Sequence, residues 1–305
     1  MFVTTPPDMP ELNEIKKMLR GQGYITDDSV AMSVFLSLQL NKPLLVEGPA
    51  GVGKTEIAKV MANALETDLI RLQCYEGLDA THALYEWNYQ RQLLHIKMTE
   101  NSSQSMDEKE KTIFSDSFLM KRPLLQAITH HKRPVLLIDE IDRSDEEFES
   151  FLLEVLSDWQ ITIPETGTIK ATYIPQVILT GNRTRELSEA LRRRCLYLYI
   201  DYPDFEKEWL IVKNKVPGID ARLAEQIAHF MQQLRIMKLE KTPGISETLD
   251  WAMALSSLHI DHLDINIIEQ TLGVVIKDWR DTREVQLSLS QLLESTGVVS
   301  KLDKV

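Results

Sequence analysis

The sequence predicts an α/β fold, in which a parallel β-sheet covered by helices is followed by a smaller all-helical domain. Three observations lead to this prediction. Short apolar segments of strand length alternate with helical patterns through the first two thirds of the chain. A glycine-rich loop separates the first of these segments from an amphipathic helix, and no strong strand pattern occurs beyond residue 204. The expected strands lie at 43–47, 69–73, 135–138, 176–180 and 196–200.

Strands that alternate with helices run parallel, so we expect helices on both faces of this sheet. The segment Asp201-Tyr202-Pro203-Asp204 marks the end of the α/β part. Helices are expected after it at 205–215, 220–238, 246–258 and 264–279. The predicted organisation is an N-terminal extension over 1–20, an α/β domain over 21–202, a helical domain over 203–290 and a tail over 291–305.

Two segments inside the α/β part carry different patterns. Residues 99–112 are polar, charged and serine-rich, which predicts a mobile loop. Residues 161–172 predict a β-hairpin with its turn near Gly167.

The composition restricts the class of protein. Hydrophobic residues make up 43% and charged residues 26% of the 305 residues, which is ordinary for a folded soluble chain. The formal net charge of −12 argues against nucleic-acid binding, because such binding depends on cationic side chains that displace counterions. Two cysteines in this length do not form a disulfide framework, and neither a leader peptide nor a membrane-length apolar run is found. We therefore expect a cytoplasmic protein without a membrane span.

The glycine-rich loop fits the phosphate-loop pattern at every position. Glycines let successive backbone N–H groups turn toward phosphate oxygens, and the following helix adds its positive end. Lys54 is expected to reach the β- and γ-phosphates of ATP, and the Thr55 hydroxyl to bind Mg²⁺. A chance glycine-rich turn is the alternative, which the strand before the loop and the helix after it disfavour. The expected nucleotide-binding residues are Gly48, Pro49, Ala50, Gly51, Val52, Gly53, Lys54 and Thr55.

A pair of acids ends the expected strand at 135–138. Ligands of parallel sheets lie at the carboxyl ends of the strands, which is where Asp139 and Glu140 follow. Asp139 would hold Mg²⁺ together with Thr55, and Glu140 would orient and deprotonate the attacking water. Acids at a strand end also serve as simple helix caps, so the pattern alone is weak and gains its weight from the phosphate loop.

Further polar residues follow the next strand. Asn182 could hydrogen-bond the attacking water beside Glu140, or be an ordinary turn asparagine. Arg192-Arg193-Arg194 ends a short helix, and one of these arginines could reach the γ-phosphate held by a neighbouring subunit. The alternatives are stabilisation of that helix end by cations and a small anion-binding patch. The histidines at 82, 95, 130 and 131 show no ligand spacing with either cysteine, so no metal site other than that of Mg²⁺ is expected.

Taken together, these residues resemble the AAA+ ATPases, and among them the MoxR type. The closest subgroup is CoxD-like, whose members are encoded beside von Willebrand A-domain proteins. The segments that carry the resemblance are Val46–Thr55, Leu137–Arg143, Ile161–Gly167, Leu187–Leu196 and Pro243–Trp251.

The resemblance implies a five-stranded parallel sheet followed by an all-α lid, and a ring of subunits, expected to be a hexamer, with ATP at each interface. It implies that Asn182 senses the nucleotide and that Arg194, or else Arg193, is the arginine finger. Tyr24 and Ile25 would contact adenine. The segment from Tyr75 to about Lys97 would hold an insert of the second helix, and the hairpin at 161–172 would face the pore.

One position departs from the family pattern. Many MoxR-type chains carry a lid arginine where this chain has Thr248, and no arginine lies between Arg235 and Arg280. A contact from the lid to the γ-phosphate is therefore in doubt, with Lys238 or Lys241 as the candidates to replace it.

The sequence thus predicts an ATPase that uses ATP and Mg²⁺ and acts as a remodelling chaperone. Its partners would be copies of itself, a von Willebrand A-domain protein and a client protein, in the maturation of a metalloenzyme or the assembly of a complex. The alternatives are a DNA-directed motor or loader, and a nucleotide-gated scaffold with little turnover.

Overall fold

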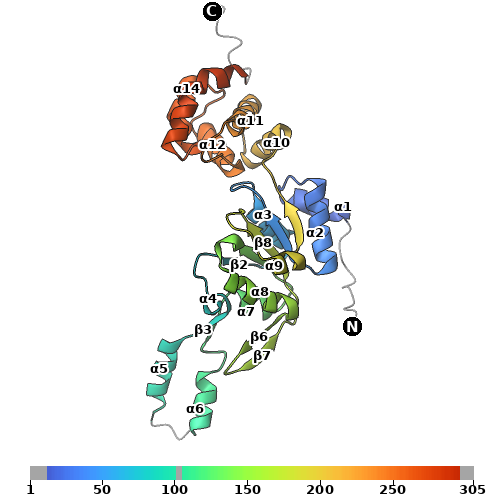
Figure 1. The fold of residues 1–305 in the computed structure, drawn as a ribbon, viewed down its shortest axis with the longest axis vertical. Helices are drawn as coiled ribbons and strands as arrows, with labels where there is room; N and C mark the ends of the chain where they lie inside the picture. Colours follow the sequence, from blue (N-terminus) through green and yellow to red (C-terminus); the bar gives the residue numbers. More distant parts are fainter. Residues whose placement is uncertain (1–11, 101–104, 296–305) are drawn as a thin grey trace, which may run out of the picture. The chain divides into compact units, whose positions relative to one another are not determined.

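The computed structural model describes residues 12–100 and 105–295. The chain divides into two compact units (Figure 1). The α/β unit comprises Met1–Gln22, Thr26–Glu47 and Thr55–Tyr199. The helical unit comprises Gly23–Ile25, Gly48–Lys54 and Ile200–Val305, so the phosphate loop up to Lys54 groups with the C-terminal helices. None of the described helices is both long and apolar enough to cross a lipid bilayer.

A five-stranded parallel sheet forms the centre of the α/β unit, with strand order β2-β5-β8-β1-β9. Every residue of β1, β5 and β8 is buried, as expected for central strands covered on both faces. The prediction of an α/β fold with this sheet and a helical C-terminal part is confirmed. The strands are β1 Leu44–Glu47, β2 Leu69–Gln73, β5 Val135–Asp139, β8 Gln176–Gly181 and β9 Leu196–Tyr199.

Helices cover the sheet because they offer apolar stripes to it. On α7, for example, Leu124, Leu125 and Ile128 are buried in the same core as Ile138 of β5. The helices of this unit around the sheet are α1 Leu12–Gly21, α2 Asp28–Leu40, α3 Lys54–Ala64, α4 Ala80–Leu84, α7 Pro123–Ile128, the 3₁₀ turn Ile141–Arg143, α8 Glu146–Asp158 and α9 Glu189–Arg194.

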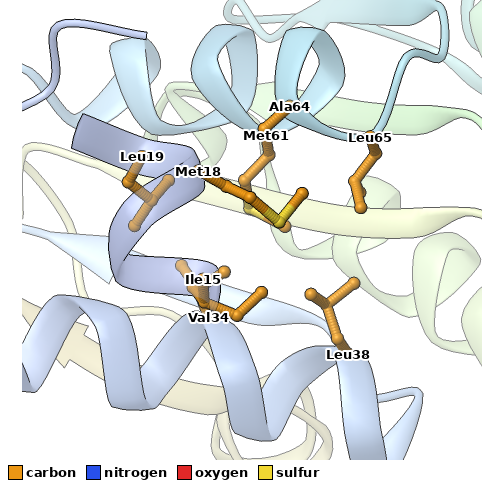
Figure 2. A pocket seen from close by; sticks show the side chains of 8 residues that line it. All are labelled: Ile15, Met18, Leu19, Val34, Leu38, Met61, Ala64 and Leu65. Carbon is orange, nitrogen blue, oxygen red and sulfur yellow. The ribbon is translucent and has the colours of Figure 1, made fainter. Parts of the chain in front are cut away.

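The first described helix takes part in this packing. Ile15 and Leu19 of α1 are buried, and with Met18 they line an apolar gap shared with α2 and α3 (Figure 2). The gap is lined only by hydrocarbon and thioether side chains, which gives no polar group for a ligand to recognise. Residues 1–11 of the expected N-terminal extension lie outside the described part of the chain.

Two antiparallel strand pairs stand apart from the main sheet. β6 Gln160–Ile163 and β7 Gly167–Lys170 form the predicted hairpin, with Gly167 at φ 91° beside the turn. The other pair joins β3 Tyr85–Trp87 to β4 Leu119–Lys121. Two helices lie between these strands in the sequence, α5 Tyr89–Met98 and α6 Met106–Ile113.

The prediction of a mobile loop over 99–112 is wrong for its second half, where α6 forms. Ser105 and Glu108 make a capping box, in which each side chain accepts from the other residue's backbone N–H. Such a box satisfies N–H groups that have no partner inside the helix, and the acids Asp107 and Glu108 suit its positive end. The helix was not predicted because the loop prediction relied on polar composition alone. Residues 101–104 lie outside the described part of the chain.

The helical unit packs its helices around one apolar core. Phe230 and Trp251 are both fully buried, with ring centroids 5.3 Å apart, and the Trp251 indole donates to Thr271 Oγ1 at 2.8 Å. The helices are α10 Phe205–Lys215, α11 Ala221–Ile236, α12 Ile245–Ser257, α13 Ile265–Val275 and α14 Trp279–Ser295. The first four agree with the predicted segments to within a few residues, whereas α14 had no predicted counterpart.

A buried ion pair ties α10, α11 and α12 together. The carboxylate of Glu208, which is fully buried, accepts two hydrogen bonds from the Arg235 guanidinium, both at 2.6 Å. Thr248 Oγ1 donates to the same carboxylate at 2.7 Å, and Gln232 Nε2 at 2.7 Å. The charge of Glu208 is therefore paired, and removal of Arg235 would leave it uncompensated.

We predict that Arg235→Ala destabilises the protein by roughly 3–5 kcal/mol, because it strands the buried Glu208 carboxylate. Arg280→Ala is the matched control, since Arg280 pairs with Asp278 on the surface. Chemical unfolding followed by tryptophan fluorescence would measure both. Equal stability of the two variants would show that the buried pair contributes no more than a surface pair.

Candidate functional site

The parallel register brings several polar side chains to one edge of the sheet. Gln73 at the end of β2 is the register partner of Asp139 at the end of β5, and β8 lies on the other side of β5. The residues that follow β5 and β8 therefore meet at their carboxyl ends. This edge carries three of the predicted site residues, Asp139, Glu140 and Asn182.

Asp139 is almost fully buried, with 3% of its surface exposed, and its carboxylate receives three donors. Thr55 Oγ1, in the first turn of α3, donates to Oδ1 at 3.0 Å, and Thr180 Oγ1 of β8 donates to the same oxygen. The Arg71 guanidinium lies 2.5 Å from Oδ2. The two predicted Mg²⁺ ligands, Thr55 and Asp139, are thus in contact, and both offer the oxygen donors that Mg²⁺ prefers.

Glu140 points elsewhere because its backbone turns out of the strand. Its φ of 56° and ψ of 50° are left-handed, which is uncommon for a residue with a Cβ. The Glu140 N–H donates to Thr180 Oγ1 at 3.0 Å, which supports this conformation. Its carboxylate meets Gln73 Nε2 at 3.0 Å, Asn182 Nδ2 at 3.4 Å and Arg143 Nε at 3.2 Å. The site therefore separates two adjacent carboxylates into two environments.

The loop that carries Asn182 is fixed by Asp142. The buried Asp142 carboxylate accepts the backbone N–H of Asn182 at 3.0 Å and that of Thr184 at 2.8 Å. The Thr184 hydroxyl donates to the same oxygen at 2.6 Å. Asn182 is consequently held beside Glu140 by its backbone, while its side chain remains able to face the carboxylate.

Sequence reasoning missed several of these residues. Gln73 and Arg71 could have been found from the expected strand at 69–73, since parallel neighbours end at the same edge. Asp142 and Arg143 lie in a segment that carries the family resemblance, but they had no predicted role because the turn after the strand could not be foreseen. Thr180 is an ordinary strand residue in the sequence and carries no signal.

The phosphate loop up to Lys54 belongs to the helical unit. Lys54 is 7% exposed, and its ammonium donates to the carbonyls of Gly48 at 2.9 Å and Pro49 at 2.6 Å. A Cβ at Gly48 would lie 1.9 Å from the Ile200 carbonyl oxygen, so only glycine fits there. The loop therefore curls around its own lysine, and the predicted contacts of the loop with phosphates stay a prediction.

The same loop contacts the N-terminus of α12. The Gly51 carbonyl accepts the N–H of Ile245 at 2.9 Å and that of Ser246 at 3.2 Å. A Cβ at Gly51, whose φ is 74°, would lie 2.6 Å from Ser246 Oγ. Free N–H groups at the start of a helix need acceptors, and here the loop supplies one. Tyr24 and Ile25, the predicted adenine contacts, are half-buried in this same unit.

The three consecutive arginines end α9 and are exposed. Arg194 Nε donates to Ser157 Oγ at 3.0 Å, Arg193 pairs with Glu189 at 2.5 Å, and Arg192 lies over the Tyr197 ring at 5.6 Å. These contacts hold the three side chains on the surface of the α/β unit.

Glu47, the residue before the phosphate loop, is buried and has a dedicated partner. The Tyr197 hydroxyl donates to Glu47 Oε2 at 3.0 Å. Partial burial of the Tyr197 ring, followed by this bond to a carboxylate, raises the pKa of Tyr197. The hydroxyl therefore stays protonated and keeps donating well above neutral pH.

Comparison with known proteins gives a match for the α/β part. A family model described as "AAA domain (dynein-related subfamily)" matches residues 43–195. An uncharacterized protein of Staphylococcus haemolyticus is 29% identical over 284 residues, which cover 91% of this chain and 99% of that protein. An uncharacterized protein of Staphylococcus aureus is 29% identical over 272 residues, covering 86% and 94%.

Among solved structures, the Thermotoga maritima RuvB Holliday junction branch migration motor is similar at 21% identity. The match covers 96% of this chain and 85% of that chain, with a TM-score of 0.45. A mutant form of the same RuvB gives 20% identity and a TM-score of 0.48 over 96% and 86%. Likenesses at this level do not extend to function.

The thiols of both cysteines have a raised pKa and therefore low reactivity. Burial raises the pKa of Cys74, which follows β2, and of Cys195, which precedes β9, to about 12 each. The nearby acids Asp139, Asp142 and Glu140 add to the effect at Cys74. An ordinary thiol titrates near pH 8.5, so both thiols stay protonated where a surface cysteine would ionise.

We predict slow alkylation of both cysteines in the folded protein at about pH 8.5, because thiolate is the reactive form. A pKa raised to about 12 lowers the thiolate fraction by roughly a thousandfold at that pH. Iodoacetamide labelling followed by mass spectrometry, with and without urea, would measure this. Folded-state labelling as fast as that in urea would contradict the assigned burial.

Proposed function

Because the chain belongs to the AAA domain family, dynein-related subfamily, we propose that it is an ATP-hydrolysing remodelling chaperone that works as a ring. The observation that carries the proposal is the separation of the two acids at the end of β5. Asp139 contacts Thr55, the residue after the phosphate-loop lysine, whereas Glu140 contacts Asn182. A metal-binding acid beside a water-orienting acid is what phosphoryl transfer to water requires.

Nucleotide binding falls to the loop from Gly48 to Thr55. Its backbone N–H groups and the Lys54 ammonium would bind the phosphates, whose oxygens compete for Lys54 with the Gly48 and Pro49 carbonyls. The Thr55 hydroxyl and Asp139 fit Mg²⁺, which when bound neutralises charge on the phosphates. Arg71 pairs with Oδ2 of Asp139 and so keeps the carboxylate in the orientation in which Oδ1 meets Thr55. Tyr24 and Ile25 would flank the adenine.

Glu140 would act on the attacking water. A general base must lie within hydrogen-bond reach of the proton that it takes, and Asn182 Nδ2, near the same carboxylate, can hold the water beside it. Gln73 and Arg143 keep the carboxylate in place from its other sides. Asp142 adds precision, because it fixes the backbone of Asn182.

Completion of the site would need a second copy of the chain. Arg194 is exposed on α9, as a residue that reaches a neighbour must be, and its contact to Ser157 holds it in place. Arg193 is the alternative finger, but its pairing with Glu189 competes with such a role. We propose a ring, most simply a hexamer, with one ATP per interface.

The helical lid would contact the phosphate loop without the usual lid arginine. Thr248, at the position of the usual lid arginine, is fully buried and bonded to Glu208, and Arg235 is bound to the same carboxylate. Neither residue is therefore available to a phosphate. The N-terminus of α12 instead binds the Gly51 carbonyl, which offers a link between the loop and the lid that needs no arginine.

The exposed face of helix α5 suits a protein partner better than DNA. On α5 the polar Gln92 is buried, whereas the apolar residues point to solvent. Exposed apolar clusters of this kind mark protein contacts, and the net charge of −12 disfavours DNA. The exposed apolar residues of α5 are Tyr89, Leu93, Leu94, Ile96 and Met98.

The finer assignment rests on the sequence motifs. We propose a MoxR-type chaperone of the CoxD-like subgroup, which acts in the cytoplasm with a von Willebrand A-domain protein to mature a metalloenzyme or assemble a complex. A nucleotide-gated scaffold is the second candidate, favoured by one observation, the loss of the lid arginine at Thr248. Turnover measured on assembled rings, with and without the partner, separates the two.

We predict that Glu140→Gln binds ATP as the unchanged protein does but lowers the turnover by about 10²–10⁴-fold, because the general base is lost. Phosphate release measures turnover, and a fluorescent ATP analogue measures binding. Glu147→Gln, an exposed acid on α8, is the control and should keep full activity. Undiminished phosphate release by Glu140→Gln would remove Glu140 from its role.

We predict that Arg194→Ala binds ATP yet loses about 10³-fold or more in turnover. Mixed with Lys54→Ala subunits it should regain activity, because an interface can then combine an intact loop from one subunit with an intact arginine from the other. Arg193→Ala is the matched control. If Arg194→Ala forms rings that hydrolyse ATP normally, Arg194 is not the finger.

A further inference from the structure

Asp68, His130 and His131 form a cluster away from the nucleotide residues. Asp68 directly precedes β2, and the two histidines lie in the turn between α7 and β5. One ligand atom from each of the three residues lies within 4.8 Å of the others. The cluster sits at the amino-terminal ends of the strands whose carboxyl ends carry Gln73 and Asp139, so it is separate from the proposed catalytic residues.

The hydrogen bonds of His130 define what its outer nitrogen can do. Nδ1 lies 2.9 Å from the Lys132 carbonyl oxygen, and since a carbonyl only accepts, Nδ1 carries the proton. The Lys132 N–H, at 3.4 Å from the same nitrogen, is the weaker contact. Nε2 is then the ring nitrogen left for a further partner, and it lies 3.1 Å from Asp68 Oδ2.

The spacing fits a metal ion. Zinc binds imidazole nitrogen and carboxylate oxygen at about 2.0–2.2 Å, which places two ligands of a tetrahedral site about 3.4 Å apart. The 3.1 Å between His130 Nε2 and Asp68 Oδ2 is close to that value. The His131 ring stands beside the His130 ring, with centroids 4.4 Å apart, and supplies a third donor. The Nδ1–carbonyl bond is the kind of contact that orients metal-bound histidines.

The backbone around the cluster is already fixed. The Asp68 carbonyl accepts the Val135 N–H at 3.0 Å, and the Thr67 hydroxyl donates to the Arg133 carbonyl at 2.7 Å. The Lys132 ammonium donates to the Glu66 carbonyl at 2.9 Å. The segments before β2 and β5 are therefore held together without a metal, so a site formed from them loses little entropy when it binds an ion.

We propose that Asp68, His130 and His131 bind a divalent transition-metal cation of the Zn²⁺ class, with solvent completing the coordination. Two imidazoles and one carboxylate suit this class and not Mg²⁺, which prefers oxygen. Lys132 Nζ lies 3.9 Å from Asp68 Oδ2, and its charge lowers the affinity of the site for a cation. It does not occupy the metal position, because it donates to the Glu66 carbonyl. The ion would join the starts of β2 and β5 and so stabilise the α/β unit.

The test uses the full chain, freed of any affinity tag and treated with a chelator, then titrated with ZnCl₂ in a calorimeter. The unchanged protein should bind one equivalent saturably and gain thermal stability with it. His130→Gln, His131→Gln and Asp68→Asn should each weaken binding by more than about tenfold, since loss of even an outer partner of a metal ligand costs about 10–100-fold. Added MgCl₂ should not lower the affinity of this site for Zn²⁺.

His82→Gln is the matched control, because His82 pairs with Asp79 on the surface, away from this cluster. Unfolding curves of each variant in chelator show whether it remains folded. The ATP turnover of zinc-free His131→Gln, measured with Mg²⁺ in excess over the chelator, should stay unchanged. Absence of saturable Zn²⁺ binding would overturn the proposal. Equal affinity in the unchanged protein and a folded His130→Gln, His131→Gln double variant would do so too.

Discussion

The Thr180 hydroxyl is the group on which the arrangement of the site depends. It donates to Asp139 Oδ1 and accepts the N–H of Glu140, so a single oxygen is bonded to both residues of the acidic pair. Without this acceptor, the left-handed backbone of Glu140 would leave its N–H unpaired at the end of a buried strand. The hydroxyl thus allows two adjacent carboxylates to point in different directions, one toward Thr55 and one toward Asn182.

This constraint works because the central strands are packed on both faces. β5 and β8 are buried along their whole length, and their register fixes Thr180 beside the strand end. In the helical unit, Arg235 and Thr248 both donate hydrogen bonds to the buried Glu208 carboxylate. The backbone at the start of α12 donates to the Gly51 carbonyl of the phosphate loop.

Much of this was predictable from the sequence, for identifiable reasons. The five strands, the phosphate loop and the acids at a strand end are local patterns, and the fold prediction that they gave is confirmed. The partners of the acids are not local: Gln73 reaches Glu140 only through strand register, and Thr180 resembles any strand threonine. Helix α6 was missed because its capping box lies in a polar segment. Asp68 was not linked to His130 because the two are far apart in the sequence and only the sheet brings them together.

The most direct measurement of this account is the ATP turnover of Thr180→Val, which keeps the shape of the side chain and removes its hydroxyl. Loss of a buried hydrogen bond costs about 1–3 kcal/mol, and each 1.4 kcal/mol corresponds to about tenfold in rate. We expect turnover to fall by about tenfold or more while the protein remains folded, and Thr162→Val on the exposed hairpin to keep its activity. Normal turnover by a folded Thr180→Val would contradict the claim that this hydroxyl positions the two acids.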